Sequence, residues 1–406
     1  MPDTLASRQA APATLSKVPA HRCAACGAPG GAKLAELHSV PTNSCLMLPS
    51  AEAARAWPRG DIALFLCESC GFIANRAFAP ELTEYSDRYE PSQGWSGAFR
   101  RYHRDLALRI AAAVPLAGKR VVEIGCGQGE FLHLLCSATG ASGQGFDPCV
   151  DPRRADVVER RTGDVRLVPA FFDEVAAATQ QADLLVCKMT LEHIPAVGRF
   201  AALCAQVARN SAPGMRLFVQ VPDSLRILRE VAIEDIYYEH CCYFTEAALR
   251  GLFARHGFAT DAVYADYDGQ YLGLLARHVG AAPAAPGPLA EVARLGAGFA
   301  AAHDAKLAAW RRRIAGAGRV ALWGSGSKGV AFLAALGRTA DAVMQVVDIN
   351  PHRQGMFMIG SGHPIVAPAA LAASRPDTVV VMNRVYREEI AATLAGLGLS
   401  PRLLAL

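Results

Sequence analysis

The sequence has little charge of either sign and no long apolar run. Charged residues make up 19% of the 406 residues, and 41 basic side chains are nearly balanced by 37 acidic ones. The resulting net charge of +4 comes with no dense basic stripe, which argues against nucleic acid or membrane as a partner. No apolar run approaches the roughly 18 to 20 residues that span a bilayer. Residues 1–20 lack the apolar core of a signal peptide, so we expect a cytoplasmic protein.

Regularly spaced cysteines are also few, because most of the 12 cysteines follow no pattern. Eight of them lie mostly in apolar segments and are expected to be reduced, buried thiols, which fits the cytoplasm. These eight are Cys45, Cys126, Cys136, Cys149, Cys187, Cys204, Cys241 and Cys242. A hydrophobic content of 52% over this length indicates a compact enzyme of two or three domains.

The remaining four cysteines form two matched Cys-x-x-Cys pairs, which are Cys23 with Cys26 and Cys67 with Cys70. Two such turns supply four thiolates, the closed tetrahedral shell of structural zinc. No nearby histidine or carboxylate is spaced like a ligand, so a catalytic zinc is not expected. Two unrelated pairs in a reduced core remain the alternative. A DNA-binding zinc ribbon has similar spacing, but it would need a basic stripe.

Strand and helix patterns alternate from about residue 106, which indicates a parallel sheet covered on both faces. Expected strands include 120–125, 143–147, 182–189 and 215–222, with helices over 129–138 and 200–209. A second, shorter β-turn-helix pattern begins at residue 319. We expect a flexible tail over 1–20, a zinc module over 21–80, a cofactor domain over 81–280, a linker and long helix over 281–316, and a C-terminal Rossmann-like domain over 317–406.

A glycine-rich turn, Glu123-Ile-Gly125-Cys-Gly127-Gln-Gly129, follows the first of these strands. Glycines let a ligand approach the backbone closely, and Asp147 lies where a carboxylate can bind ribose hydroxyls. Glycine spacing alone leaves a nicotinamide site open, but Glu123 suits a cationic cofactor better than a pyrophosphate. The turn and the segment 188–195 (KMTLEHIP) together resemble the class I S-adenosylmethionine methyltransferases. The resemblance implies that Glu123, Gly125, Gly127, Gly129, Asp147, Lys188, Glu192 and His193 bind this cofactor.

A cluster of Tyr237, Tyr238, Glu239 and His240 lies between a strand and a helix that starts near Thr245. Such loops carry the ligand sites of α/β sheets. A base, a carboxylate and a phenol are therefore available within four residues. The alternative is that His240 fills the entry of the helix and that Glu239 is solvated.

The order of these motifs resembles the zinc-containing sugar C-methyltransferases, three-domain enzymes that methylate carbon on nucleotide-linked keto-deoxysugars. The C-terminal motifs that continue the match are 324–329 (GSGSKG), 347–351 (VDINP), 354–355, 364–365, Asn383 and 389–390. The resemblance implies two bound cofactors, S-adenosylmethionine and Zn²⁺, and a role in deoxysugar or antibiotic biosynthesis. It places Tyr237, Glu239 and His240 at the substrate carbon, with Tyr85 or Tyr89 nearby, of which we select Tyr89 as catalytic. Gly324, Gly326, Lys328 and Asn383 are expected to hold the nucleotide-sugar, with Lys328 at the diphosphate; a solvated Lys328 is the alternative.

The expected reaction removes a proton from a carbon next to a ketone and transfers the methyl group there. His240 would be the base with Glu239 orienting it, and Tyr237 would donate a hydrogen bond to the enolate oxygen. Two departures leave the acceptor open: Tyr238 replaces a histidine that is usual in the family, and the turn 268–271 (DGQY) replaces a His-Gly-Gly-Ser-like turn. Alternatives are methylation of another small molecule at carbon, oxygen or nitrogen, a nucleotide-binding regulator with a zinc ribbon, and a nicotinamide oxidoreductase. The oligomeric state cannot be inferred.

Overall fold

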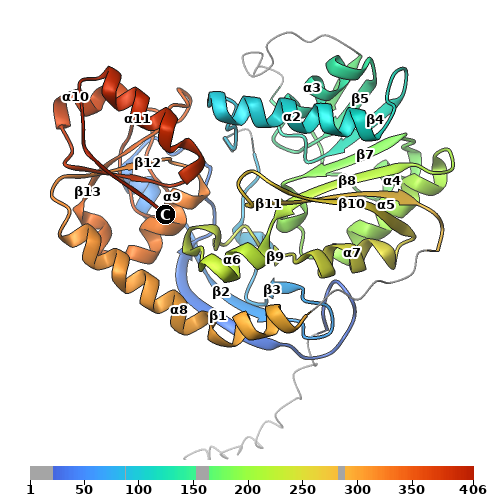
Figure 1. The fold of residues 1–406 in the computed structure, drawn as a ribbon, viewed down its shortest axis with the longest axis horizontal. Helices are drawn as coiled ribbons and strands as arrows, with labels where there is room; N and C mark the ends of the chain where they lie inside the picture. The colour runs from blue at the N-terminus through green and yellow to red at the C-terminus, as the bar shows by residue number, and fades with distance from the viewer. Residues whose placement is uncertain (1–21, 87, 152–163, 282–288) are drawn as a thin grey trace, which may run out of the picture.

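The computed structural model describes residues 22–86, 88–151, 164–281 and 289–406. These residues form three β-sheets, which Figure 1 shows as a blue N-terminal sheet below, a central sheet on the right and an orange-to-red C-terminal sheet on the left. The flexible tail expected over 1–20 and most of the linker expected after residue 281 lie outside the described residues. The domain boundaries remain a prediction.

The N-terminal sheet is antiparallel, with strand order β1-β2-β3-β9. Its elements are β1 (Ala32–Pro41), α1 (Ala51–Arg55), β2 (Arg59–Leu66), β3 (Ile73–Asn75), the 3₁₀ helix η1 (Pro80–Leu82) and β9 (Cys242–Tyr243). The last strand comes from far along the chain, because Ile73 pairs with Tyr243 and Ala74 with Cys242. The segment that follows His240 is therefore attached to the N-terminal sheet.

The central sheet has seven strands in the order β10-β11-β8-β7-β4-β5-β6. Its elements are α2 (Gly97–Ala113), β4 (Arg120–Ile124), α3 (Glu130–Thr139), β5 (Ser142–Phe146), β6 (Val165–Val168), α4 (Glu174–Thr179), β7 (Leu184–Lys188), η2 (Leu191–His193), α5 (Val197–Asn210), β8 (Arg216–Pro222), α6 (Ser224–Glu230), η3 (Ile233–Asp235), α7 (Glu246–Ala254), β10 (Phe258–Asp266) and β11 (Tyr271–His278). Five strands are parallel, as the alternating pattern predicted. The other two differ from that expectation: the tight turn 267–270 makes β10 and β11 a hairpin, and β11 runs antiparallel to β8.

Alternating side chains of the parallel strands cover the two faces of this sheet. Val122 and Leu185 pack with α5 and α7, and Val121 and Val186 pack with α2 and α3. The chain adds β5 and β6 on one side of β4, and then β7 and β8 on the other. In open α/β sheets, ligands bind beyond the carboxyl ends of the strands at such a reversal.

The C-terminal sheet is fully parallel, with strand order β14-β13-β12-β15-β16. Its elements are β12 (Val320–Trp323), α9 (Ser327–Leu336), η4 (Gly337–Ala342), β13 (Val343–Val347), β14 (Ile365–Val366), η5 (Pro368–Ala370), α10 (Leu371–Ser374), β15 (Thr378–Val381), η6 (Arg384–Tyr386), α11 (Arg387–Gly396) and β16 (Arg402–Ala405). It has its own reversal, between β12 and β15.

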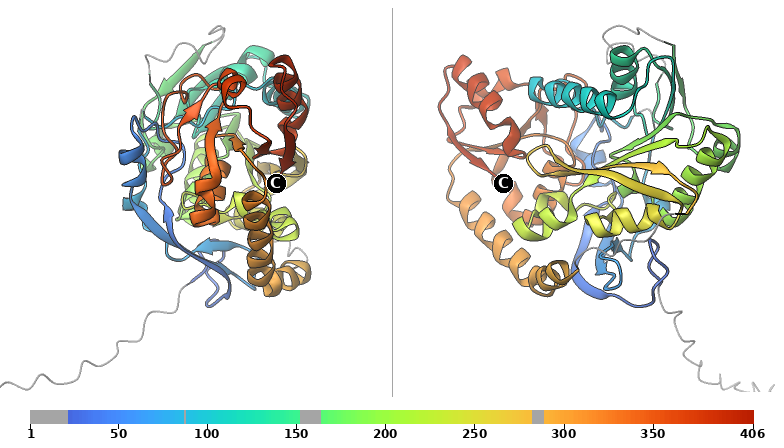
Figure 2. Two further views of the ribbon diagram at one scale, coloured as in Figure 1. Left: turned by 90° about the vertical axis from the view of Figure 1, so that its left-hand side faces the viewer. Right: turned by 45° about the vertical axis from the view of Figure 1, so that its right-hand side comes forward.

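A long helix, α8 (Ala290–Ala315), connects the outer two sheets. Figure 2 shows it running from the N-terminal strands to the C-terminal unit. Its Gly296 packs on Leu34 of β1, and its Trp310 meets Phe332 of α9 edge-on, with ring centroids 5.3 Å apart. Among the described residues, no helix is long and apolar enough to cross a membrane.

Candidate active site and metal centre

One cavity of about 510 Å³ receives residues from all three parts of the chain. The carboxyl ends of β4, β5 and β7 contribute Gly125, Asp147 and Lys188. The C-terminal sheet contributes Gly324 and Asn383 from the ends of β12 and β15. The two predicted glycine turns therefore face the same space.

The first glycine turn requires glycine because of its backbone conformation and, at Gly125, because a side chain would have no space. Gly125, Gly127 and Gly129 have φ values of 73°, 53° and 82°, in the left-handed region that other residues avoid. A Cβ on Gly125 would lie 2.0 Å from Oγ1 of Thr190, whereas a Cβ on Gly127 would meet nothing within 4 Å in the protein. Asp147 fixes the turn, since its Oδ2 accepts a hydrogen bond from the Gly127 N–H at 2.9 Å.

Two buried carboxylates near this turn lack hydrogen-bond partners among the described residues. Oε2 of Glu123 and both carboxylate oxygens of Glu192 have none. Burial raises the pKa of Glu123 to about 7, although Lys188 opposes this rise, and burial raises the pKa of Glu192 to about 8. Unpaired buried carboxylates are costly, so this part of the cavity suits a positively charged ligand.

A histidine–tyrosine pair lies beside the same cavity. The Tyr237 hydroxyl is 2.5 Å from Nε2 of His240, and the two rings lie tilted by 39° with centroids 3.9 Å apart. His193 meets the His240 ring edge-on at 4.9 Å and contacts the Tyr85 hydroxyl through Nδ1 at 3.0 Å. Burial lowers the pKa of His240 well below its usual value, so the imidazole is neutral at physiological pH and has a lone pair for a proton.

The carboxylate beside His240 is not the one expected. Glu239 accepts hydrogen bonds from Asn43 Nδ2 at 3.1 Å and from the Ser44 hydroxyl, both in the N-terminal segment. Oε1 of Glu192, which we had placed at the cofactor, instead lies 3.9 Å from His240 Nε2. The expectation that Glu239 orients His240 therefore differs from the contacts. Nothing in the sequence pairs residues so far apart.

The tyrosines divide by the direction in which they point. Tyr85 and Tyr89 both line the cavity, with ring centroids 5.3 Å apart, and Tyr89 interacts with the Glu239 carboxylate. Tyr238 points away from it, since its hydroxyl accepts a hydrogen bond from the Ala79 N–H and its ring packs on Phe78.

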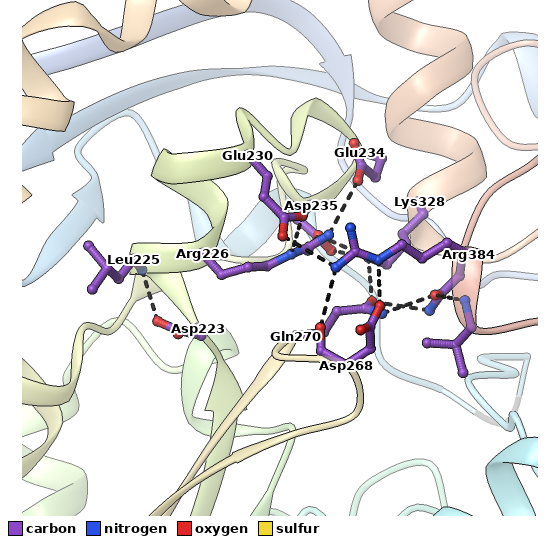
Figure 3. A network of polar contacts seen from close by, with 12 residues as sticks. Asp223, Leu225, Arg226, Glu230, Glu234, Asp235, Asp268, Gln270, Lys328 and Arg384 are labelled. Carbon is purple, nitrogen blue, oxygen red and sulfur yellow. Dashed lines mark hydrogen bonds and ion pairs between the residues drawn. The ribbon is translucent and has the colours of Figure 1, made fainter. Parts of the chain in front are cut away.

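The residues expected to bind substrate in the C-terminal part are partly engaged with the protein itself. Lys328 Nζ donates to Asp235 Oδ2 at 2.9 Å and to Gln270 Oε1 at 3.0 Å. Figure 3 shows Lys328 between Asp235 and Gln270. Asn383 and Gln270 exchange two amide hydrogen bonds, at 3.0 and 3.1 Å. The sequence marked Gln270 only as a departure and gave no signal for Asp235.

The second glycine turn repeats the arrangement of the first. Gly324 has a φ of 118°, and Gly326 precedes α9. Asp348, which follows β13, accepts a hydrogen bond from the Ser325 N–H at 2.9 Å. Asp348 thus stands to this turn as Asp147 stands to the first, although only Asp147 was predicted.

The four expected zinc ligands meet at one point. Their sulfur atoms all lie within 4.8 Å of one another, with Cys23 to Cys70 at 3.7 Å and Cys26 to Cys67 at 3.6 Å. A tetrahedron with Zn–S bonds of about 2.3 Å has edges of about 3.8 Å, so these residues fit a structural zinc ion. Glu192, His193 and His240 also lie within 4.8 Å of one another. Both imidazoles, however, are already hydrogen-bonded to tyrosines.

Comparison with known proteins identifies the enzyme class. Residues 95–263 match a methyltransferase domain, and residues 298–398 match the C-methyltransferase C-terminal domain. The chain is an S-adenosylmethionine-dependent methyltransferase. It is similar to C-methyltransferase NovU of Streptomyces niveus, with 28% identity over 348 residues that cover 80% of each chain. This relative and the C-terminal domain match both indicate transfer to carbon.

Other similarities are confined to the central part. A ubiquinone biosynthesis O-methyltransferase of Ralstonia nicotianae is 30% identical over 148 residues, or 34% of this chain and 59% of that protein. Among solved structures, magnesium protoporphyrin IX methyltransferase of Synechocystis PCC 6803 aligns with a TM-score of 0.35 and 18% identity. That alignment covers 45% of this chain and 84% of the other.

The first glycine turn and its surroundings fit S-adenosylmethionine. Asp147, at the end of β5, is placed to accept hydrogen bonds from ribose hydroxyls. The open space above Gly127 lets a ligand approach the backbone, and the unpartnered oxygens of Glu123 and Glu192 suit the positive charges of this cofactor. Lys188, buried beside Glu123, offsets part of the negative charge.

We predict that the protein carries about one equivalent of zinc. Substitution Cys67→Ser should remove the metal and lower the thermal stability, because the four sulfurs hold 23–26 against 67–70. Elemental analysis and thermal unfolding under reducing conditions check this. Cys136→Ala, at a buried cysteine outside the cluster, is the control that should retain the metal. Protein that is stable and metal-free as purified would contradict the assignment.

Substitution Gly127→Ala should weaken binding of S-adenosylhomocysteine by at least about tenfold, because a methyl group there would meet the ligand and no protein atom. Gly118→Ala is the matched control, since Gly118 also has a positive φ of 68° and open space around its Cβ position. Both variants should lose about 1 kcal/mol of stability from backbone strain. Calorimetric binding separates them, and equal affinities in the two variants would refute the site.

Affinity for S-adenosylmethionine should rise with pH between about 6 and 8.5. Glu123 and Glu192, with pKa values of about 7 and about 8, hold protons at the lower end of this range. A sulfonium cation favours their ionised forms, so its binding releases protons and tightens as pH increases. S-adenosylhomocysteine shares every other group but lacks the sulfonium charge, so its affinity should rise less. Calorimetry on both ligands tests this, and a constant affinity ratio would argue against it.

Proposed function

We propose that the chain methylates a carbon next to a ketone on a nucleotide-linked keto-deoxysugar. The observation that carries this proposal is the pairing of His240 with Tyr237 beside a cavity that both glycine turns face. A neutral base and a phenol donor are the two groups that enolate formation needs. The C-methyltransferase domain match and the similarity to C-methyltransferase NovU support carbon as the accepting atom.

His240 takes the proton from the acceptor carbon. The C–H bond breaks, an N–H bond forms on the imidazole, and the electron pair moves into the enolate. Nε2 faces the Tyr237 hydroxyl, and Nδ1 has no partner among the described residues, so we assign the free lone pair to Nδ1. Nε2–H then donates to the Tyr237 oxygen, which leaves the phenol proton available for the ketone oxygen. Burial keeps the pKa of Tyr237 high, so this proton is retained.

S-adenosylmethionine held at the first glycine turn would supply an electrophilic methyl group, with a neutral thioether as the leaving group. The residues around it hold the reacting carbon in contact with that methyl group and exclude water. Such positioning can be worth an effective molarity of about 10⁵ to 10⁸ M. The side chains that enclose the base are Tyr85, Tyr89, His193 and Glu192, contributed by the N-terminal segment and η2.

The second glycine turn supports a nucleotide handle on the acceptor. A glycine turn that opens a helix binds anionic groups well, and an acidic residue at the end of the next strand suits ribose hydroxyls. Gly324, Gly326 and Asp348 have these positions and line the cavity. The proposal therefore assigns the first turn to the methyl donor and the second to the nucleotide of the acceptor.

A second candidate function is methylation of a different small molecule. Two observations support this second function. The central part is similar to a ubiquinone biosynthesis O-methyltransferase, and Gln270 is hydrogen-bonded to both Lys328 and Asn383. The two functions differ in product, because a C–CH₃ group and an O–CH₃ group give distinct NMR signals. A mass-spectrometric screen of nucleotide-sugars, with S-adenosylmethionine present, tests the first directly.

On the acceptor found in that screen, His240→Gln should lower kcat by about 10²- to 10⁴-fold, since it removes the general base. Binding of S-adenosylhomocysteine should stay unchanged. The control is Tyr238→Phe, which alters a neighbouring tyrosine that points away from the cavity and should preserve turnover. Steady-state kinetics and calorimetry measure the two effects. Near-normal turnover by the His240 variant would exclude it as the base.

A further inference from the structure

The ammonium group of Lys328 is engaged by acceptors of the protein itself. Its ammonium group lies 2.8 and 2.9 Å from the two oxygens of Asp235 and 3.0 Å from Oε1 of Gln270. An ammonium group has three N–H donors, and three acceptors surround this one. The carboxylate also neutralises its charge. Lys328 therefore does not present the free cation that a diphosphate ligand would need.

Asp235 connects this lysine to the proposed base. It ends η3, is 7% exposed and lies two residues before Tyr237. It also accepts a hydrogen bond from Arg226 NH1 at 2.5 Å. Burial opposes ionisation of Asp235, but Lys328 and Arg226 outweigh burial and hold its pKa below the usual value. The negative charge of Asp235 is thus balanced by two cations, Lys328 and Arg226.

Gln270 and Asn383 extend the contact to the other side of the cavity. Gln270 lies in the turn between β10 and β11, and its own carbonyl accepts a hydrogen bond from the Asp223 N–H at 2.9 Å. Its amide pairs with Asn383, which follows β15 of the C-terminal sheet. A chain of contacts therefore runs from the Tyr237–His240 segment through Asp235, Lys328 and Gln270 to Asn383. Figure 3 shows its central part, with Asp235, Lys328 and Gln270.

Among the described residues, the cations at this wall of the cavity are balanced by nearby carboxylates. Arg226 faces Glu230 and Asp235, with Glu234 4.0 Å away, and Lys306 lies 4.0 Å from Glu234. Lys328 belongs to α9, which packs directly on η3 and begins at the second glycine turn. Lys328 is therefore placed to link the second glycine turn with the Tyr237–His240 segment.

We propose that Lys328 is a positioning residue, which tethers the Tyr237–His240 segment to the second glycine turn through Asp235 and Gln270. This inference rests on the proposed role of His240 as the base. The tether sets where the imidazole lies relative to an acceptor held at the second turn. Under this proposal Lys328 does not bind the acceptor. It orients His240, the group that removes the proton from the acceptor.

Hydrogen exchange tests the tether without any acceptor. In the complex with S-adenosylhomocysteine, Lys328→Met and Asp235→Asn should each speed amide exchange in residues 233–243 by at least about tenfold. The double variant should exchange no faster than the more affected single variant, because one broken pair leaves a buried charge that the double variant lacks. Lys328→Arg, which keeps the cation, should restore most of the protection.

The matched control is Arg384→Met, which breaks ion pairs with Asp268 and Glu230 across the same two parts of the chain but does not touch Asp235. It should leave exchange in 233–243 unchanged. Additive effects of the two single variants, or equal effects of the control, would overturn the tether. These outcomes do not depend on whether a nucleotide-sugar is the acceptor.

Kinetics on the acceptor found in the screen separates positioning from binding. Lys328→Met should lower kcat about tenfold or more with KM little changed, because the lysine acts through the base. A raised KM with kcat unchanged would show that Lys328 binds the acceptor, and the proposal would be wrong. If His240→Gln proves fully active, the proposed function fails, while the exchange experiment still reports on the tether itself.

Discussion

The parallel strands of two sheets end at one shared cavity, and the positions of the other reactive groups depend on this arrangement. Each sheet reverses its strand order at that edge, beside β4 in one and β12 in the other. Each reversal carries a glycine turn held by an aspartate, Asp147 or Asp348. A donor and an acceptor bound at the two turns would meet in the space between them. The Tyr237–His240 segment lies in that space because β9, which follows it, pairs with β3 of the N-terminal sheet.

Burial controls the chemistry of this space more than any single ion pair. Taken together, loss of a proton from carbon and gain of a methyl group leave the acceptor's charge unchanged. The positive charge that arrives with the cofactor must therefore end on a protein group, and His240 is the one proposed to receive it. Glu192, at 3.9 Å from Nε2, is placed to stabilise the imidazolium that results. Its unpartnered oxygens, costly in the resting enzyme, are consistent with a site arranged for this charge.

Local patterns predicted the elements that depend on local sequence. The buried strands β4, β7 and β8, the helices α3 and α5, the strand-turn-helix pattern that begins at residue 319 and the Cys-x-x-Cys turns were expected, because apolar runs, glycines and cysteine spacing are visible within a few residues. The hairpin of β10 and β11 was missed, since an apolar run does not give strand direction. The partners of Glu239 were missed as well. Asn43 and Ser44 lie almost 200 residues away, and only the tertiary fold brings them to that carboxylate.

The two departures from the family pattern have different physical weight. Tyr238 lies on the far side of its segment, where its ring fills the space beside Gly60 and Phe78, so the substitution there changes packing and not the cavity. Gln270 lines the cavity and occupies Lys328 and Asn383 together. A smaller residue at that position would release the Asn383 amide and one donor of Lys328, which would still be held by Asp235. We therefore expect the turn 267–270 to influence the choice of acceptor; its residues Tyr267 and Asp268 have φ of 53° and 59° and precede the glutamine in this turn.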